Sequence, residues 1–299
     1  MKSLFHYLSI TKNHPQPIAF LFVKLFGVNF SRKFFSIKRN GYKLNLAEDD
    51  VSMSLFHKGK NTYKSIEILL QKLLQKGNNF IDIGGSVGLH SIYAKLIVEN
   101  GTVIMVEPMP NLVQTALDNF SLNKTVIKLI PAAINNDSTS IEMVNLGFES
   151  FIKLDDLEDN NLLNPTIVGD RKFNNDFNVK LKIDACTLDS VTENIDKIRL
   201  IKIDTEGAEL FAVKSGINTL KKTDALLVGL FNPYTTSRYN YKAIDTANFL
   251  VSNGFEIIIR VNDELGLSSV DLINERFETS DYYIFIKKDL INDLGLVIN

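Results

Sequence analysis

The chain has 299 residues, a hydrophobic share of 45% and a formal net charge of −2. These values are typical of a globular protein with one large domain or two small ones, and they give no electrostatic reason to expect nucleic acid as the main partner. The single cysteine, Cys186, excludes a disulfide framework and a metal site built on cysteine pairs, and it is consistent with a cytoplasmic location.

Residues 1–60 are predicted to form a basic and aromatic N-terminal extension. All charged side chains before Glu48 are basic, and the apolar run over residues 18–30 is too short to span a bilayer. The favoured interpretation is a helix packed on the main domain, with its lysines solvated. The alternative is that residues 17–43 contact a protein partner or lie peripherally on the inner membrane surface.

From residue 61 to residue 289 the sequence alternates between helix and strand patterns, and residues 290–299 form a short tail. Residues 146–178 interrupt this pattern, because they are polar and show no sustained period, so they are predicted to be an insertion of loops and short strands. Helices are expected at 64–74, 88–98, 111–122, 241–251 and shortly after 203; strands are expected at 80–83, 102–107, 126–131, 140–144, 179–183, 198–203, 225–230, 255–260 and 282–287.

This alternation predicts a doubly wound α/β fold, in which a mostly parallel sheet carries helices on both faces. In such folds, ligands bind at the carboxyl ends of the strands, near the point where the strand order reverses. The residues that follow each predicted strand are therefore the first candidates for a binding site.

The first of these strand ends is rich in glycine. Asp82 is followed by Gly84, Gly85, Ser86 and Gly88, which is a G-x-x-x-G spacing and not the G-x-G-x-x-G of dinucleotide sites. An acid beside the turn would repel a pyrophosphate but suits a ligand with positive charge, such as S-adenosylmethionine. The alternative is that Asp82 only caps the turn.

The second predicted strand ends in Glu107 and Pro108. A carboxylate at this position of a doubly wound sheet faces the same cleft and can accept both hydroxyls of a ribose. The alternative is that Glu107 is a solvated strand end.

Several motifs together resemble the FkbM-type methyltransferases, which are class I S-adenosylmethionine-dependent O-methyltransferases. The matching segments are Phe-Ile-Asp-Ile-Gly-Gly-Ser-Val-Gly-Leu-His-Ser at 80–91, Val-Glu-Pro at 106–108, Asn119 and Asn123, Thr-Leu-Asp-Ser at 187–190, Ile-Lys-Ile-Asp-Thr-Glu-Gly-Ala-Glu at 201–209 and Lys-Ser-Gly at 214–216. The chain departs from the family at Gly85-Ser86, where Ala-Asn is usual, and at 230–233, where many members have an acid.

The resemblance implies a Rossmann-like, mostly parallel seven-stranded sheet and S-adenosyl-L-methionine as the cofactor. The cofactor-binding residues expected are Asp82, Gly84, Gly85, Ser86, Gly88, Glu107, Pro108 and Ala133.

Asp204 and Glu206 are the candidate catalytic residues. They follow the predicted strand at 198–203, and in the implied fold they face the methyl donor and the acceptor. A hydroxyl acceptor needs a base or a metal before it can attack a methyl group, and two carboxylates in one turn can serve either purpose. For Glu209 the favoured interpretation is structural. For His90 it is packing or solvation, and no spacing of His, Asp and Glu predicts a metal site.

Three functions remain open at this stage. The first is S-adenosylmethionine-dependent O-methyl transfer to a hydroxyl of a glycan or another small metabolite. The second is a scaffold protein that binds the cofactor without turnover, and the third is a nicotinamide-dependent oxidoreductase, which the glycine spacing disfavours. The sequence indicates neither the acceptor nor the oligomeric state.

Overall fold

A computed structural model of the chain describes residues 16–47, 50–58, 63–137, 140–145, 150–152, 179–229, 236, 239–261, 264–268 and 282–293. Most of the predicted insertion at 146–178 lies outside these residues, and so does the segment 230–233.

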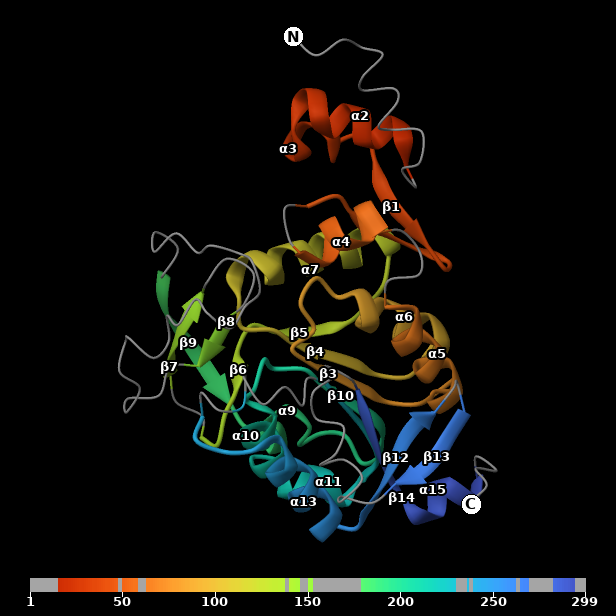
Figure 1. The fold of residues 1–299 in the computed structure, drawn as a ribbon, viewed down its shortest axis with the longest axis vertical. Coiled ribbons are helices and arrows are strands. Elements are labelled where there is room, and N and C mark those ends of the chain that lie inside the picture. The colour runs from red at the N-terminus through yellow and green to blue at the C-terminus, as the bar shows by residue number, and fades with distance from the viewer. Residues whose placement is uncertain are drawn as a thin grey trace.

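The central sheet has the strand order β13-β12-β14-β11-β10-β3-β4-β5 (Figure 1). Five neighbouring strands are parallel, β14 runs antiparallel to β11, and β12 runs antiparallel to β14. The expected mostly parallel, seven-stranded, Rossmann-like sheet is thus confirmed, and β13 adds a further antiparallel strand at the edge. The bounds are β3 Phe80–Ile83, β4 Val103–Val106, β5 Lys128–Ile130, β10 Ile198–Ile203, β11 Thr223–Val228, β12 Phe255–Val261, β13 Glu264–Ser268 and β14 Tyr283–Lys287.

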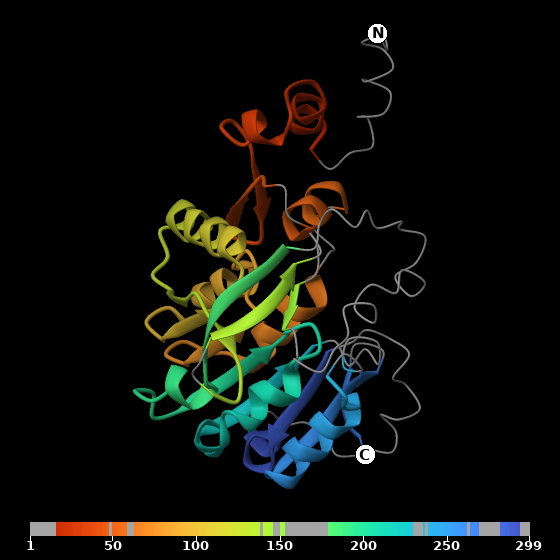
Figure 2. The same cartoon turned by 90° about the vertical axis from the view of Figure 1, so that its left-hand side faces the viewer.

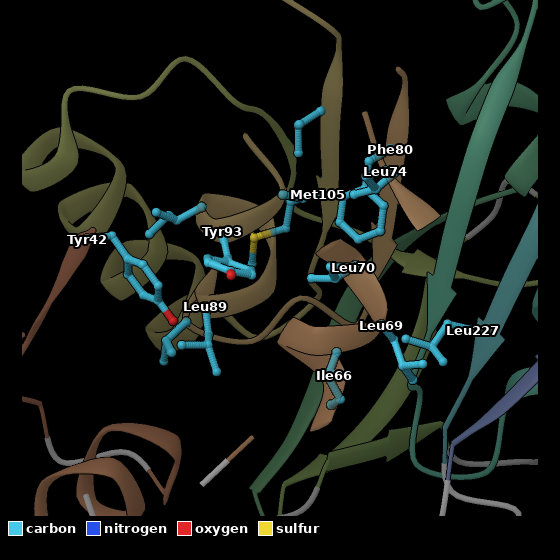
Figure 3. Close-up of a cluster of buried hydrophobic side chains, with 14 of the residues drawn as sticks. Tyr42, Ile66, Leu69, Leu70, Leu74, Phe80, Leu89, Tyr93, Met105 and Leu227 are labelled. Carbon is cyan, nitrogen blue, oxygen red and sulfur yellow. The ribbon is translucent and has the colours of Figure 1, made fainter. Parts of the chain in front are cut away.

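Helices cover both faces of this sheet, and for this reason the central strands are apolar at almost every position. Successive strand residues point to opposite faces, so Phe80 joins one core cluster and Ile81 the other. Figure 3 shows part of the first cluster, where α5 packs on the strands. The helices on that face are α5 Lys64–Leu73, α6 Leu89–Val98 and α7 Pro110–Asn123; those on the other are α9 Leu188–Val191, α10 Glu209–Lys214, α11 Ile217–Lys221 and α13 Ala243–Ser252, and α15 Lys288–Asp293 follows the last strand.

A second sheet, which the sequence pattern does not predict, lies beside the first (Figure 2). Its order is β6-β9-β7-β8, and β7 and β9 flank the predicted insertion and pair with each other in antiparallel fashion. The bounds are β6 Ala133–Ile134, β7 Ser140–Asn145, β8 Ser150–Ile152 and β9 Val179–Cys186.

The N-terminal extension is helical, as expected, but it also contains a β-hairpin. The elements are α2 Pro17–Phe26, α3 Val28–Ser31, β1 Ser36–Arg39, β2 Tyr42–Asn45 and α4 Asp50–Lys58. Leu44 and Leu46 are buried in the same core cluster as the sheet, so the hairpin shares the core of the main domain. The domain boundary near residue 60 stays a prediction.

Two asparagines of α7 hold the hairpin in place. Asn123 accepts a hydrogen bond from the Lys43 amide at 2.8 Å and donates one to the Lys43 carbonyl at 2.6 Å, so its side chain replaces a neighbouring strand. Asn119 accepts from the Asn45 amide at 2.7 Å. Because backbone groups at a strand edge need partners, these two side chains satisfy β2 where no strand can pair with it.

A buried ion pair fastens the other side of the hairpin. The Nε of Arg39 lies 2.5 Å from Glu67 Oε1, and the side chains are 1% and 2% exposed. The same carboxylate accepts hydrogen bonds from the Tyr42 hydroxyl at 2.6 Å and from Asn40 at 2.7 Å. Burial and the Glu67 carboxylate raise the pKa of the Tyr42 hydroxyl, which stays protonated as the donor.

We expect Glu67→Gln to lower the free energy of unfolding by about 3–5 kcal/mol, because the buried Arg39 guanidinium loses its carboxylate. The matched control is Lys76→Ala, which breaks the ion pair with Glu99, whose side chains are 68% and 54% exposed, and it should cost less than about 1 kcal/mol. Urea denaturation followed by circular dichroism measures both. Equal losses from the two variants would show that the hairpin is not held by this pair.

Candidate functional site

The parallel strands end side by side at one edge of the sheet. The backbone ladder continues past the strands there: the Gly84 amide donates to the Val106 carbonyl at 2.9 Å, and the Asp204 amide donates to the Ile83 carbonyl at 3.0 Å. The predicted glycine turn, the Glu107 strand end and the Asp204 turn are therefore neighbours, as the topology of a doubly wound sheet requires.

Two glycines in the turn permit close contacts that any larger residue would prevent. Gly84 has φ +72°, and a Cβ placed on it would lie 1.9 Å from the backbone oxygen of Asp204. Gly88 has φ +81°, and its Cβ would lie 2.5 Å from a ring carbon of Phe120. Glycine is thus favoured at both positions for two reasons: a Cβ has no space, and the backbone has a positive φ.

The departure from the family at Gly85 has a packing explanation. A Cβ on Gly85 would lie 2.5 Å from Cγ and 2.8 Å from the sulfur of Met105, a fully buried residue on β4. The methionine side chain fills the space that an alanine at 85 would need. Glycine at 85 and methionine at 105 are therefore complementary.

Glu107 is buried, with 4% of its surface exposed, and it binds the glycine turn directly. Its Oε2 accepts the Ser86 amide at 2.8 Å, and its Oε1 accepts the Met109 amide at 2.9 Å. Burial raises the pKa of the carboxyl to about 7, although these two amides oppose the shift. The alternative of a solvated strand end is wrong for Glu107. Each oxygen can still accept a further hydrogen bond.

Asp82 is fully buried and is neutralised by a lysine whose role the sequence does not reveal. Lys202 lies opposite Asp82 in the β10–β3 register, and its Nζ is 3.1 Å from Asp82 Oδ1 and 3.3 Å from the Gly84 carbonyl oxygen. The Ser91 hydroxyl donates to Asp82 Oδ2 at 2.7 Å. Direct contact between Asp82 and the cofactor stays a prediction. The charge of Asp82 is balanced within the protein.

The ammonium group of Lys202 also faces Asp204, at 3.8 Å from Oδ2. Burial disfavours its charged form, but the carboxylates of Asp82 and Asp204 outweigh this effect and raise the pKa of Lys202 above its ordinary value. The lysine is therefore a permanent cation below the glycine turn. In the sequence, Lys202 stands out as a charged residue inside an apolar strand and as part of the segment 201–209 that resembles the family, and neither shows what it contacts.

Asp204 has a second partner in Tyr282, whose hydroxyl donates to Asp204 Oδ2. Burial first, and then the charge of Asp204, raise the pKa of Tyr282 well above its ordinary value, so the phenol stays a donor. Gly229 leaves room for this pair, because its Cβ would lie 2.7 Å from the tyrosine ring. Asp204 Oδ1 has no hydrogen-bond partner among the described residues.

The two glutamates of the Asp204 turn have different environments. Glu206 is half-buried with φ +54°, and its charge contributes to the raised pKa of Tyr282, so it belongs to the same group of side chains. Glu209 is buried, and its Oε1 accepts the amides of Thr205 at 2.9 Å and of Gly207 at 3.1 Å. The structural role favoured for Glu209 is thus confirmed.

Pro108 and Ala133 lie close to the turns. Pro108 is half-buried between Glu107 and Met109. Ala133 is buried on β6 in a small cluster with Met109 and Ala208, so it joins the second predicted strand end to the Asp204 turn. Cofactor contact by either residue stays a prediction.

His90 is packed, as favoured from the sequence. It is 8% exposed and makes an edge contact with the ring of Tyr63, at 5.9 Å between ring centroids. Burial, followed by the charge of Lys202, lowers its pKa to about 3, so the imidazole is neutral. Among the residues that the structure describes, no group of three His, Cys, Asp or Glu side chains could hold a metal ion.

These features fit S-adenosylmethionine. Gly84 and Ser86 are partly exposed, which leaves backbone accessible at the turn. Glu107 retains acceptor capacity for ribose hydroxyls. Asp204 Oδ1 still lacks a hydrogen-bond partner among the described residues.

We expect Gly84→Ala to lower the free energy of unfolding by more than about 4 kcal/mol, because its Cβ would collide with the Asp204 carbonyl. The control is Gly254→Ala, which has φ +86° and no atom within 4 Å of the added Cβ, so only the conformational cost of about 1–2 kcal/mol remains. Urea denaturation distinguishes the two. A similar loss in both would mean that the turn can move away from β10.

A second prediction concerns the pH dependence of stability. Burial, with a smaller contribution from Asp204, raises the pKa of Glu209 from 4.5 to about 7, although the amides of Thr205 and Gly207 oppose the shift. Between these values the folded carboxyl keeps a proton that the unfolded chain has released, so the free energy of unfolding declines as pH rises. We expect Glu209→Gln to remove up to about 1.4 kcal/mol per pH unit of this decline.

The measurement is the difference between wild type and Glu209→Gln in urea denaturation across this pH range. The difference is needed because Glu107 contributes a slope of the same sign and His90 one of the opposite sign. Parallel stability curves for the two proteins would contradict a raised pKa at Glu209.

Comparison with known proteins gives a family match and several solved structures of low similarity. The Methyltransferase FkbM domain model matches residues 82–257, and no curated protein matches the chain. Among solved structures, a putative rRNA methylase from Clostridium thermocellum is 8% identical with a TM-score of 0.42, covering 76% of this chain and 96% of that one. The precorrin-6y C5,15-methyltransferase of Geobacter metallireducens GS-15 is 12% identical with a TM-score of 0.40, covering 77% and 89%.

A putative methyltransferase from Streptococcus mutans, SMU.1697c, in complex with SAH, is 10% identical with a TM-score of 0.40 and covers 74% of this chain and 94% of that one. These scores are too low to assign a substrate. The family match is different, because it spans more than half of the chain and includes the glycine turn, Glu107 and the Asp204 turn. The chain belongs to the FkbM methyltransferase family, and its cofactor is S-adenosylmethionine.

Proposed function

We propose that the protein transfers a methyl group from S-adenosylmethionine to a hydroxyl of a glycan or another small metabolite. The observation that carries this proposal is Asp204, whose Oδ2 is held by Tyr282 and faces Lys202 while Oδ1 has no partner among the described residues. A hydroxyl is a poor nucleophile until a group accepts its proton. A carboxylate that is held on one oxygen, and whose other oxygen is buried without a hydrogen-bond partner among the described residues, suits this task.

Each residue then has a separate role. When bound, S-adenosylmethionine supplies an electrophilic methyl group, and Glu107 and the glycine turn would hold its adenosyl part. Asp204 accepts the hydroxyl proton as the acceptor oxygen attacks, and the Lys202 ammonium group lies 3.8 Å from Asp204 Oδ2. The Tyr282 hydroxyl orients the carboxylate. Glu206 is a second carboxylate near the same position.

A strong base is not required for this reaction. Alignment of the two reactants alone can supply on the order of 7–11 kcal/mol in the best cases. The close approach of Gly84 to the Asp204 backbone supports such alignment, because it places the cofactor turn directly against the turn that carries the candidate base.

The proposed acceptor class excludes nucleic acid, and this remains a prediction. Binding to RNA depends mainly on basic contacts to phosphates, whereas the chain has a net charge of −2 and a pI near 6.1. One of the similar structures is named a putative rRNA methylase, so RNA belongs among the acceptors tested.

The experiment combines calorimetry with S-adenosylmethionine and transfer of a labelled methyl group to polysaccharides, monosaccharides, hydroxylated metabolites and RNA. We expect Asp204→Asn to reduce kcat by about 10²–10⁴-fold with cofactor affinity almost unchanged. Tyr282→Phe should cause a smaller loss, because it changes only the orientation of Asp204. The control Asp196→Asn removes an exposed acid before the other end of β10 and should have no effect.

Glu107→Ala tests the cofactor side separately, and it should weaken binding of S-adenosylmethionine. Unchanged binding in this variant would contradict the role of Glu107. Cofactor binding without transfer to any acceptor would favour the scaffold alternative, and labelling of RNA alone would overturn the proposed acceptor class.

A further inference from the structure

The N-terminal helices present an exposed aromatic surface that the proposed reaction does not use. Four phenylalanine rings follow one another at 5.2–5.5 Å between centroids, in the order Phe22, Phe26, Phe30 and Phe34. The last three are 55%, 42% and 63% exposed. We call this group the aromatic face; Ile18 and Leu25 of α2 are also exposed, at 67% and 49%.

One side of α2 is exposed, and the other side is buried. Ala19 and Phe20 are buried in the main core cluster, and Phe20 stacks on Phe56 of α4 at 6.4 Å between centroids. Gly27, with φ +78°, turns the chain from α2 into α3, and Val28 is buried next to it. The aromatic face is thus held by the core and does not depend on an unfolded tail.

The position of these helices matters for what they can contact. Figures 1 and 2 both show α2 and α3 at one end of the molecule, beyond the hairpin and α4. A surface that projects in this way is suited to a flat partner more than to a ligand that needs a concave pocket.

The charged residues in the segment that carries the aromatic face are all basic. Residues 16–47 include six basic residues and no acidic residue, although the whole chain has a net charge of −2. Lys24, Arg32, Lys33, Lys38 and Lys43 are exposed, whereas Arg39 is buried against Glu67. A second copy of this face would be repelled, because a two-fold contact brings like charges together. An anionic partner is attracted.

We propose that the aromatic face lies on the surface of an anionic lipid bilayer, with the phenylalanine rings in the interfacial region and the basic residues at the headgroups. Exposed Phe, Leu and Ile flanked by Lys and Arg are typical of interfacial membrane helices. In the described part of the chain, no helix is long and apolar enough to cross a bilayer.

The test is sedimentation of the full-length protein with vesicles. One set contains phosphatidylcholine alone, and the other contains equal parts of phosphatidylcholine and phosphatidylglycerol. We expect the protein to sediment with the anionic vesicles and to stay in solution with the neutral ones. Binding should weaken as salt is added, because the headgroup attraction is screened within about 10 Å at moderate ionic strength.

Matched variants separate the two contributions. Phe26→Gln with Phe34→Gln should weaken binding at least about tenfold, since two exposed rings no longer insert. The control Val126→Gln changes an apolar side chain that is 83% exposed on the main domain and should bind as wild type does. Arg32→Gln with Lys33→Gln should weaken binding roughly fivefold for each charge. Lys72→Gln near the end of α5, combined with Lys76→Gln in the turn after it, should not weaken binding.

Three results would overturn the proposal. The first is a wild-type protein that stays in solution with anionic vesicles. The second is an aromatic variant that binds as tightly as Val126→Gln. The third is a wild-type protein that does not bind vesicles but self-associates in sedimentation velocity, together with an aromatic variant that does not self-associate. That result would assign the aromatic face to contact with a second copy of the chain. Since all substituted side chains are exposed, circular dichroism should show that each variant is folded.

Discussion

The buried ammonium group of Lys202 is the constraint on which the site depends. An unpaired charge in a protein interior costs several kcal/mol, so the lysine has to be matched by carboxylates. Asp82 provides one from β3, where it lies directly opposite Lys202. Asp204 provides another from the end of β10, the strand that carries Lys202. The lysine also donates to the Gly84 carbonyl. One cation thus joins β3, β10, the cofactor turn and the candidate base, and these parts cannot shift independently without leaving a charge unmatched.

Close packing of the glycine turn adds a second constraint to the one that the ion pairs of Lys202 impose. Gly84 brings the turn against the Asp204 backbone, Gly85 fits against Met105, and Gly88 fits against Phe120. None of these contacts leaves space for a Cβ without movement of a neighbour. Glycine at 85 is therefore matched to the Met105 side chain, and the turn still has its accessible backbone. This packing supports cofactor binding more than the loss of it.

The N-terminal extension is connected to the same turn. Asn119 accepts a hydrogen bond from β2 and donates one to the Val87 carbonyl within the glycine turn, so one side chain joins the hairpin to the cofactor site. The Arg39–Glu67 pair fixes the hairpin to α5. An aromatic face anchored in this way would hold the catalytic edge in a constant orientation relative to a bilayer. Such an arrangement suits an enzyme whose acceptor is presented at a membrane, although the two proposals are tested independently.

The sequence by itself determined most of the alternation of strands and helices in the main domain, the mostly parallel sheet and the common location of Asp82, Glu107 and Asp204. These follow from local periodicity and from the rule that parallel strands place their carboxyl ends at one edge. Only the tertiary structure showed that Lys202 neutralises Asp82, that Tyr282 orients Asp204, and that a second sheet and a hairpin flank the domain. Lys202 and Tyr282 meet partners 120 and 78 residues away, and no local pattern specifies such a pair. Site residues could be predicted from the sequence where the backbone path alone places them. They could not be predicted where two side chains from distant parts of the chain have to meet.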